Sequence, residues 1–451
     1  MKAKVSVILP SLNVADYMEE CLESVINQSL RELEIICVDA GSTDGTKEIL
    51  DDYAGKDSRI TVLQSDIKSY GKQVNIGLDY ASGEYIGILE TDDWIEADMY
   101  QCLYETARAD ALDYAAADFD TFYQLQNGAY YFARQHLFGV EKQEWYGKIL
   151  NSTQLATLRA SDYVLWKAVY NRQFLNTNHI RLHESDGAAF QDMGFLQQIK
   201  TYAGRAKYLD RSFYRYRQNR DGSSSVSLEG LHYYMREFLW INDSLNMRGV
   251  LNDFHSKYYY LTMSISFITK YEQILVNLDG NWQDERLCTP YNWFKEQVTD
   301  AVERNVLDET LYEKEQWNRL MLLLKSQEFH AKLIGNREKK KRKCIQEFIG
   351  RVGNRTVVIF GCGVRGERLL QFCDRNDISI HSFCDNNAKL QGEEKYGFTV
   401  MSPVNLKKFL NQKNGVVLLS MKSGREEVSR QLQTMGIGTD KIIQYIPDGI
   451  L

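Results

Sequence analysis

Proline is scarce in this chain of 451 residues, which contains only Pro10, Pro290, Pro403 and Pro447. A proline-rich linker is therefore excluded, and we expect helices or tight turns to join the domains in place of flexible tethers. At about 150 residues per domain, the length predicts roughly three domains.

Long apolar runs are also missing, because no stretch approaches the roughly 20 residues that span a bilayer. The N-terminal run Val5–Leu9 stops at Pro10 and no small-residue cleavage site follows, so a secretory signal is not expected. We expect a cytoplasmic chain, with peripheral attachment to the inner face of the membrane as the open alternative.

The sequence has neither paired cysteines nor an excess of basic residues. Its eight cysteines form no Cys-x-x-Cys pair, and several lie in apolar patterns, which is typical of buried thiols in a reducing compartment. With 54 basic and 61 acidic residues the net charge is −7, which argues against a nucleic-acid partner. A composition of 44% hydrophobic and 25% charged residues excludes a disordered or collagenous chain.

What is present is an alternation of strand and helix patterns up to about residue 115. Strands are expected at 4–9, 33–38, 60–63 and 85–89, with a helix following the first and another around 74–80. Such units predict an α/β fold with a parallel sheet covered on both faces. Ligands of these sheets bind beyond the carboxyl ends of the strands, so the residues just after each strand are the candidates for function.

Three acidic residues, Glu90, Asp92 and Asp93, follow the fourth of these strands. In an extended chain Glu90 and Asp92 project to one side and Asp93 to the other, so the first two could share a cation such as Mg²⁺ or Mn²⁺. The alternative is a solvated acidic turn that caps a helix beginning near Glu96. Asp39, at the end of another strand of the same sheet, favours the site.

These segments resemble family 2 glycosyltransferases of bacterial type, which have the GT-A fold. The resemblance covers about residues 1–225 and rests on the segments 5–13 (VSVILPSLN), 34–46 (EIICVDAGSTDGT), 75–78 (NIGL), 81–86 (ASGEYI) and 90–95 (ETDDWI). It implies a transferase that uses a nucleotide diphosphate sugar as donor and a divalent cation, Mn²⁺ or Mg²⁺, as cofactor.

The resemblance also assigns roles to individual residues on the donor side. It implies that Asp92 is the main ligand of the divalent ion. Glu90 stands where the family usually has aspartate and could reach the metal or the ribose, which leaves open which of the two ligands is direct and which acts through water. Val74 stands where many relatives carry arginine, and Lys72 is expected to supply that charge. The residues implied to contact the nucleotide are Pro10, Ser11, Asp39, Lys72, Thr91, Arg217, Ser223 and Ser224, the last three in an arginine and serine-rich loop that closes over the donor or, alternatively, is a simple linker.

On the acceptor side, inversion needs a base that removes the proton of the acceptor hydroxyl. The segment 187–195 is similar to the family's Glu-Asp motif, which implies that Asp192 is the base, with Gln191 in place of the preceding acid. The alternative is that Asp192 only caps the following helix. Trp166 and Gln191 are the residues expected to contact the acceptor, although an isolated tryptophan is more often part of a core.

Residues 226–350 read as helical and rich in aromatic side chains, and they end in the run Arg337–Lys343, where six of seven residues are Lys or Arg. We interpret this run as a solvated helix face, with an anionic membrane surface or an acidic partner as alternatives.

From residue 356 the α/β pattern returns. A strand, the turn Gly361-Cys362-Gly363-Val364-Arg365-Gly366, a helix and a second strand ending at Asp385 predict a Rossmann-like module. It resembles nucleotide-sugar-binding modules of bacterial sugar-modifying enzymes, so the second nucleotide site comprises Gly361, Gly363, Gly366 and Asp385. A nicotinamide-dependent enzyme and a structural module with an empty pocket are the alternatives.

We therefore expect a GT-A transferase domain at 1–225, a helical connector and acceptor region at 226–350 and a Rossmann-like domain at 351–451. The expected activity is the inverting, metal-dependent transfer of a hexose or N-acetylhexosamine, UDP-linked, to a saccharide or lipid-linked acceptor in the synthesis of surface polysaccharide or glycoconjugate. The alternative is a non-catalytic nucleotide-sugar-binding or scaffolding protein. The sequence leaves open a homo-oligomer and peripheral contact with a membrane.

Overall fold

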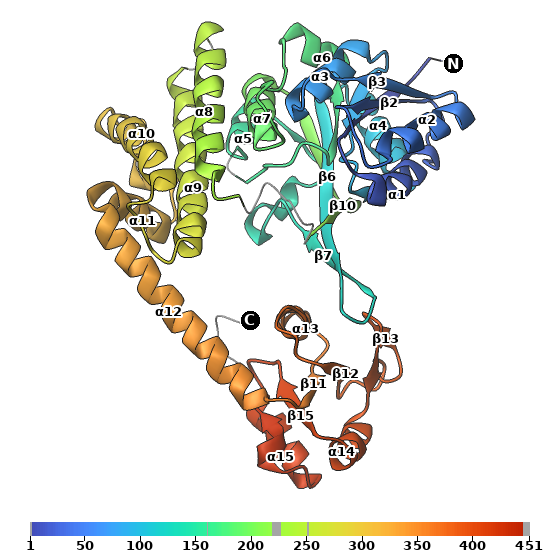
Figure 1. Ribbon diagram of the computed structural model, residues 1–451, viewed down its shortest axis with the longest axis vertical. Coiled ribbons are helices and arrows are strands. Elements are labelled where there is room, and N and C mark those ends of the chain that lie inside the picture. Colours follow the sequence, from blue (N-terminus) through green and yellow to red (C-terminus); the bar gives the residue numbers. More distant parts are fainter. Residues whose placement is uncertain (1, 160, 219–226, 250–251, 445–451) are drawn as a thin grey trace. The chain divides into compact units, whose positions relative to one another are not determined.

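The computed structural model describes residues 2–159, 161–218, 227–249 and 252–444 (Figure 1). These residues form two compact units. The first comprises Met1–Phe122 and Phe132–Lys332, and the second comprises Tyr123–Tyr131 and Leu333–Leu451. The division into three domains stays a prediction.

The first unit begins with four parallel strands in the order β3-β2-β1-β4. Their bounds are β1 Val5–Ser11, β2 Leu33–Asp39, β3 Ile60–Gln64 and β4 Tyr85–Ile88, and they alternate with the helices α1 Ala15–Ile26, α2 Thr46–Lys56 and α3 Tyr70–Tyr80. Helix α1 buries Met18, Cys21, Leu22 and Val25, which recur at the helical spacing of one face. The predicted α/β fold is confirmed, and these strands position the candidate site at their carboxyl ends.

The same sheet continues beyond β4 in the order β9-β6-β10-β5, with mixed strand directions. The remaining bounds are β5 Trp94–Ile95, β6 Tyr114–Gln124, β7 Tyr130–Gln135, β8 Ile149–Leu150, β9 Ala168–Asn171, β10 Ala206–Arg217, α4 Met99–Ala109, η1 Val140–Trp145, α5 Ser152–Ala156, α6 Arg172–Thr177 and α7 Gln191–Tyr202. The helix expected near Glu96 begins at Met99 because Trp94 and Ile95 pair with β10 as a short strand.

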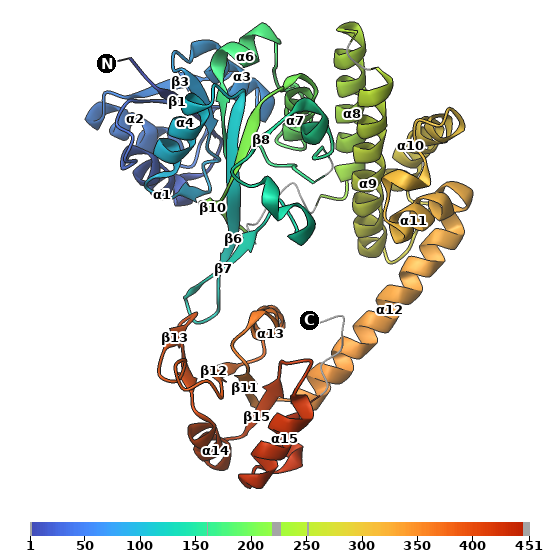
Figure 2. The ribbon, with the colours of Figure 1, turned by 180° about the vertical axis from the view of Figure 1, so that it is seen from behind.

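The region after β10 is helical, as predicted. It contains α8 Gly230–Met247, α9 Asp253–Asn277, α10 Glu285–Glu303, η3 Glu309–Leu311, α11 Lys314–Lys325 and α12 Gln327–Val352. Helices α8 and α9 lie side by side in both views of the chain (Figures 1 and 2). Within the described residues, every helix is too short or too polar to cross a membrane.

The second unit contains a six-stranded sheet in the order β13-β14-β12-β11-β15-β16, parallel except for β13. Its elements are β11 Thr356–Phe360, α13 Val364–Arg375, β12 Ile380–Cys384, β13 Glu394–Lys395, β14 Phe398–Met401, α14 Pro403–Gln412, β15 Gly415–Leu419, α15 Arg425–Thr434, η4 Thr439–Lys441 and β16 Ile442–Ile443. The alternation of strand and helix predicted from residue 356 is confirmed. Strand β11 lies at the centre of this sheet, between β12 and β15.

The tip of the hairpin between β6 and β7 belongs to the second unit. The backbone N–H of Gln126 donates to the Asp374 carboxylate at 3.0 Å, and the amide of Asn127 donates to the carbonyl oxygen of Tyr396 at 3.0 Å. The rings of Tyr131 and Tyr396 lie 4.9 Å apart. The nine residues 123–131, which interrupt the sequence of the first unit, therefore complete the second unit.

Candidate active site

Three neighbouring parallel strands of the first unit end at one edge of its sheet. Ser11 pairs with Asp39 in the register of β1 and β2, and the hydroxyl of Thr91, just beyond β4, donates to the carbonyl oxygen of Pro10 at 3.0 Å. All four residues are buried. The structure thus brings together four of the residues predicted to contact the nucleotide.

The buried Asp39 carboxylate organises the turn that follows β2. It accepts the backbone N–H groups of Gly41 at 2.9 Å and Ser42 at 3.1 Å, and the hydroxyl of Ser42 at 2.5 Å. Gly41 has φ +80°, a conformation that favours glycine. Asp39 therefore shapes the wall of the site, and its contact with a nucleotide base stays a prediction.

Strand β4 ends at Ile88, and the acidic residues beyond it lie in a turn. The expected alternation of side chains to opposite sides of an extended chain therefore does not apply to them. Glu90 and Asp92 are both partly buried. The hydroxyl of Tyr70, at the start of α3, donates to the Glu90 carboxylate at 2.6 Å. Glu90 is thus held by a phenol from a different element.

Asp93, the third acidic residue of this turn, is 1% exposed. Its carboxylate accepts the hydroxyl of Tyr214 at 2.8 Å and the backbone N–H of Arg217 at 2.7 Å, both from β10. Burial raises the pKa of Asp93 well above its usual value, and the charge of Asp92 raises it further. Asp93 therefore anchors the turn to β10, while Glu90 and Asp92 remain the candidate ligands.

The donor set fits the predicted cation. The charges of Asp92 and Glu90 both contribute to the raised pKa of Asp93, which reports an accumulation of negative charge that a divalent cation would offset. Carboxylate oxygens are the ligands that Mg²⁺ and Mn²⁺ prefer. The binding of the ion stays a prediction.

Asp192 is the second residue of α7 and is partly buried. The N-cap position belongs to Phe190, so Asp192 does not cap the helix in the way that the alternative supposed. Its carboxylate accepts the N–H of Met193 at 2.9 Å. Burial raises the pKa of Asp192 to about 7, and the charge of Glu237 adds to the rise. A carboxyl group with a pKa near neutrality suits a general base.

Two tyrosines connect Asp192 with the acidic turn. Burial raises the pKa of Tyr70, and the charges of Glu90 and then Asp192 raise it further. Burial also raises the pKa of Tyr216, and all four carboxylates contribute to that rise. All four carboxylates, Glu90, Asp92, Asp93 and Asp192, which we call the carboxylate cluster, therefore influence the Tyr216 phenol, and Glu90 and Asp192 also influence that of Tyr70.

Helix α3 and the segment before α7 are tied together. The Lys72 ammonium pairs with Glu184 at 3.1 Å, and the Asn75 amide donates to the carbonyl oxygen of Leu182 at 2.9 Å. The buried Gln191 amide donates to the Ser185 hydroxyl at 3.0 Å. Lys72 and Gln191 hence brace the loop that positions Asp192, and their predicted ligand contacts are untested.

Arg217 ends β10 beside the acidic turn. Its Nε donates to the carbonyl oxygen of Asp92 at 2.9 Å, and its guanidinium pairs with Glu20 and lies over the Phe122 ring. A phosphate would therefore compete with Glu20 for this side chain. Ser223 and Ser224, the other members of the predicted loop, lie outside the described residues.

Trp166 does not line an open acceptor surface. The indole is 5% exposed and stacks on the Tyr214 ring at 3.9 Å, with Phe119 at 4.8 Å and Tyr216 at 5.1 Å. Too little of its face is open to stack on a sugar ring. Trp166 instead packs behind Tyr214 and so supports the residue that holds Asp93.

In the second unit, the glycine turn follows β11 and begins α13, as predicted. Gly361 has φ +103°, and a Cβ on Gly366 would lie 2.0 Å from the Gly361 carbonyl oxygen, so both positions require glycine. Gly363 caps α13, and the Asp385 carboxylate accepts the Cys362 N–H at 3.0 Å. The context fits the prediction, and the second nucleotide site itself is untested.

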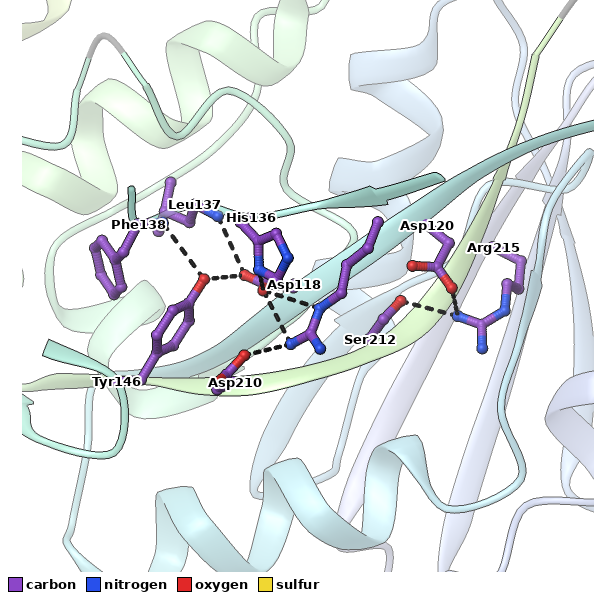
Figure 3. A network of polar contacts seen from close by, with 10 residues as sticks. Asp118, Asp120, His136, Leu137, Phe138, Tyr146, Asp210, Ser212 and Arg215 are labelled. Atoms are coloured by element: carbon purple, nitrogen blue, oxygen red, sulfur yellow. Dashed lines mark hydrogen bonds and ion pairs between the residues drawn. The ribbon is translucent and has the colours of Figure 1, made fainter. Parts of the chain in front are cut away.

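A further polar cluster, which the sequence did not indicate, joins β6, β7 and β10 (Figure 3). The fully buried Asp118 accepts the Tyr146 hydroxyl at 2.6 Å and contacts the His136 ring at 3.0 Å. Asp118, His136 and Asp210 lie close enough for a metal ion. However, the Arg134 guanidinium already pairs with Asp118 at 3.1 Å and Asp210 at 2.5 Å, so an internal cation balances the charge there.

Sequence reasoning missed Tyr70, Tyr214 and Tyr216. The signal that could have found two of them was present in the segment 214–217, because tyrosine and arginine alternate there. In a strand this places both tyrosines on one face and both arginines on the other. Nothing in the sequence marked Tyr70, whose partner Glu90 lies 20 residues away.

Comparison with known proteins identifies two family matches. Residues 6–175 match glycosyl transferase family 2, and residues 353–443 match the family described as C2185-like, N-terminal. Cholesterol galactosyltransferase of Borreliella burgdorferi is 29% identical over 309 residues, which cover 67% of this chain and 83% of that protein.

The uncharacterized glycosyltransferase EpsJ of Bacillus subtilis is 30% identical over 224 residues, or 49% of this chain, and the chain spans only 63% of its length. Among solved structures, S. aureus TarS 1–349 aligns with a TM-score of 0.48 and 18% identity, over 75% of this chain and 92% of that one.

Proposed function

The chain belongs to glycosyltransferase family 2, and from that premise we propose that it is an inverting, metal-dependent enzyme. It moves a hexose or N-acetylhexosamine from a UDP-linked donor to a saccharide or lipid-linked acceptor in the synthesis of a surface polysaccharide or glycoconjugate. The relative named cholesterol galactosyltransferase supports a hexose as the donor sugar and a lipid as the acceptor.

The observation that carries this proposal is the carboxylate cluster. Glu90 and Asp92 follow β4 on the proposed donor side, and Asp192 lies in the first turn of α7 on the proposed acceptor side. The shared influence of Glu90 and Asp192 on the pKa of Tyr70 supports their facing one site. A metal ligand pair opposite a base is the arrangement that displacement at an anomeric carbon requires.

In the proposed reaction, the acceptor hydroxyl gives its proton to Asp192 as its oxygen bonds to the anomeric carbon of the donor. The attack comes from the face opposite the diphosphate, so the configuration inverts, and the bond between that carbon and the diphosphate oxygen breaks with its electron pair remaining on that oxygen. A divalent ion held by Asp92 and Glu90 would neutralise the negative charge of the leaving diphosphate.

Other residues of the chain hold these groups in place. Tyr70 fixes the Glu90 carboxylate, and Tyr214 fixes Asp93 and accepts the backbone N–H of Glu90 at 3.1 Å. Lys72 and Gln191 brace the segment before Asp192. Such bracing reduces the reorganisation needed when the reaction begins.

The test begins with a thermal-shift panel of nucleotide sugars, with and without Mn²⁺, on the full chain. The donor so found is then used with Asp192→Asn, which should lose transfer and keep nucleotide binding. Asp186→Asn, an exposed carboxylate of the same loop, is the matched control and should retain transfer. Full transfer by Asp192→Asn would remove this residue from the role of base.

The alternative of a non-catalytic binding protein makes a different prediction. It requires donor binding without metal-dependent transfer or donor hydrolysis in any acceptor mixture. Family membership favours the enzyme. Turnover that depends on added Mn²⁺ or Mg²⁺ and is lost in Asp92→Asn would exclude the binding protein.

A further inference from the structure

Helix α12 contains a long stretch that the other described residues cover only in part. Between the buried Ile334 and the buried Phe348, none of the thirteen residues 335–347 is buried. We call residues 335–347 the basic segment. At about 1.5 Å per residue it is a helical rod of roughly 20 Å whose surface faces solvent.

The charge of the basic segment opposes that of the rest of the chain. It carries six basic residues, all exposed, and the two acids Glu338 and Glu347, which gives +4 in a chain of net charge −7. The Lys343 side chain is 78% exposed and reaches Glu347 only at 3.9 Å. Most of the Lys343 charge therefore remains available to an external partner.

The spacing of these charges works against the isolated helix. Lys340 lies three residues after Arg337 and three before Lys343, and Lys343 lies four after Lys339, so like charges neighbour one another on the helix surface. Such pairs destabilise a helix, and this helix gains little from burial along the basic segment. An anionic surface beside the helix would attract the basic side chains and offset the repulsion between them.

An apolar side chain adjoins the basic residues. Leu333 is 48% exposed and, at positions i, i+4 and i+7, shares a helix face with Arg337 and Lys340. At a lipid interface the leucine can enter the boundary between headgroups and acyl chains, while the basic side chains keep their charges among the phosphates. The basic segment has no aromatic residue to stack on the bases of a nucleic acid.

We propose that the basic segment of α12 binds the anionic surface of a membrane and attaches the enzyme to it peripherally. This attachment is independent of the sugar-transfer chemistry. It would hold the chain at the surface where a lipid-linked acceptor resides, but its test needs neither donor nor acceptor.

The test is sedimentation of the full chain with vesicles of phosphatidylcholine containing about 30% phosphatidylglycerol, against vesicles of phosphatidylcholine alone. Binding should require the anionic lipid and should vanish near 1 M salt, where the Debye length is about 3 Å. Each lysine near the surface strengthens binding about fivefold, so a variant with Lys339, Lys340 and Lys341 all changed to Gln should bind roughly 100-fold more weakly.

The matched control changes the net charge equally at a different place. Lys408, Lys413 and Lys422 are exposed in the same unit, and their joint change to Gln should leave vesicle binding unaltered. Circular dichroism and the thermal midpoint establish that both variants fold. Equal loss in both variants, no binding to anionic vesicles at 50 mM salt, or binding to RNA in preference to vesicles would overturn the proposal.

Discussion

Replacing Asp192 with asparagine is expected to stabilise the protein at neutral and alkaline pH while it abolishes transfer. Burial raises the pKa of this carboxyl from 3.8 to about 7, so the native protein keeps a proton that the unfolded chain releases between these values. Because the native state binds more protons in this window, the free energy of unfolding falls as the pH rises from about 4 to 7. Asparagine stays neutral in both states.

The magnitude follows from the pKa. The pKa of Asp192 differs by about three units between the folded and the unfolded state. At 1.36 kcal/mol per pKa unit, this corresponds to about 4 kcal/mol of unfolding free energy. Since Asp192 is partly exposed, solvent reduces this to about 2–4 kcal/mol. Most of the stability that the parent loses through ionisation of Asp192 is lost above pH 5. The free energy of unfolding of Asp192→Asn should therefore exceed that of the parent by about 2 kcal/mol more at pH 8 than at pH 5.

The assay is urea unfolding at pH 5, 6, 7 and 8, followed by the fluorescence of the seven tryptophans. Asp186→Asn, exposed in the same loop, should show no such dependence on pH. The transfer rate of the parent should rise about tenfold per pH unit up to about pH 7 and then level. An advantage of Asp192→Asn that is the same at pH 5 and pH 8 would refute the reasoning.

Tyr70→Phe should raise the Mn²⁺ concentration for half-maximal transfer by about tenfold or more, because Glu90 loses a charge-assisted hydrogen bond of about 1.5–3 kcal/mol; an unchanged metal titration would contradict this. Asp162→Asn should cost about 3–5 kcal/mol in urea unfolding, since the buried Lys167, 2.7 Å away, and the buried Lys200 would lose their counter-charge; a loss under 1 kcal/mol would show that water reaches them. EDTA should abolish transfer and Mn²⁺ should restore it, whereas transfer that persists in EDTA would exclude the metal.

The meeting of the strand-end residues was accessible from the sequence because they lie at the ends of neighbouring strands of one sheet, while their roles stay predictions. Pro10, Asp39 and Asp92 each follow an apolar run, and a parallel sheet brings such ends together. The fine arrangement was not accessible in this way. Asp93 is fixed by Tyr214, 121 residues further along the chain, and no local pattern links the two.

Side-chain burial was the second property of the site that the sequence did not reveal. The indole of Trp166 is a side chain that can stack on an acceptor sugar. In the fold it packs against Tyr214 and Phe119, which lie on strands that long-range pairing places beside it. Helix α4 begins three residues after Glu96 because β5 pairs with β10. In both cases a tertiary contact decided what local propensity left open.

The hairpin tip at 123–131 has a practical consequence for dissecting the protein. Because those residues complete the C-terminal unit, the backbone passes from one unit to the other at 122, at 131 and at 332. A fragment cut at residue 225 would leave Tyr123 and Tyr131 without their partners Arg375 and Tyr396, and a fragment that starts at 351 would lack a piece of itself. Fragments, domain swaps and fusions with boundaries chosen from the linear sequence would therefore separate residues 123–131 from the unit in which they pack. Structural and enzymatic work should use the undivided chain.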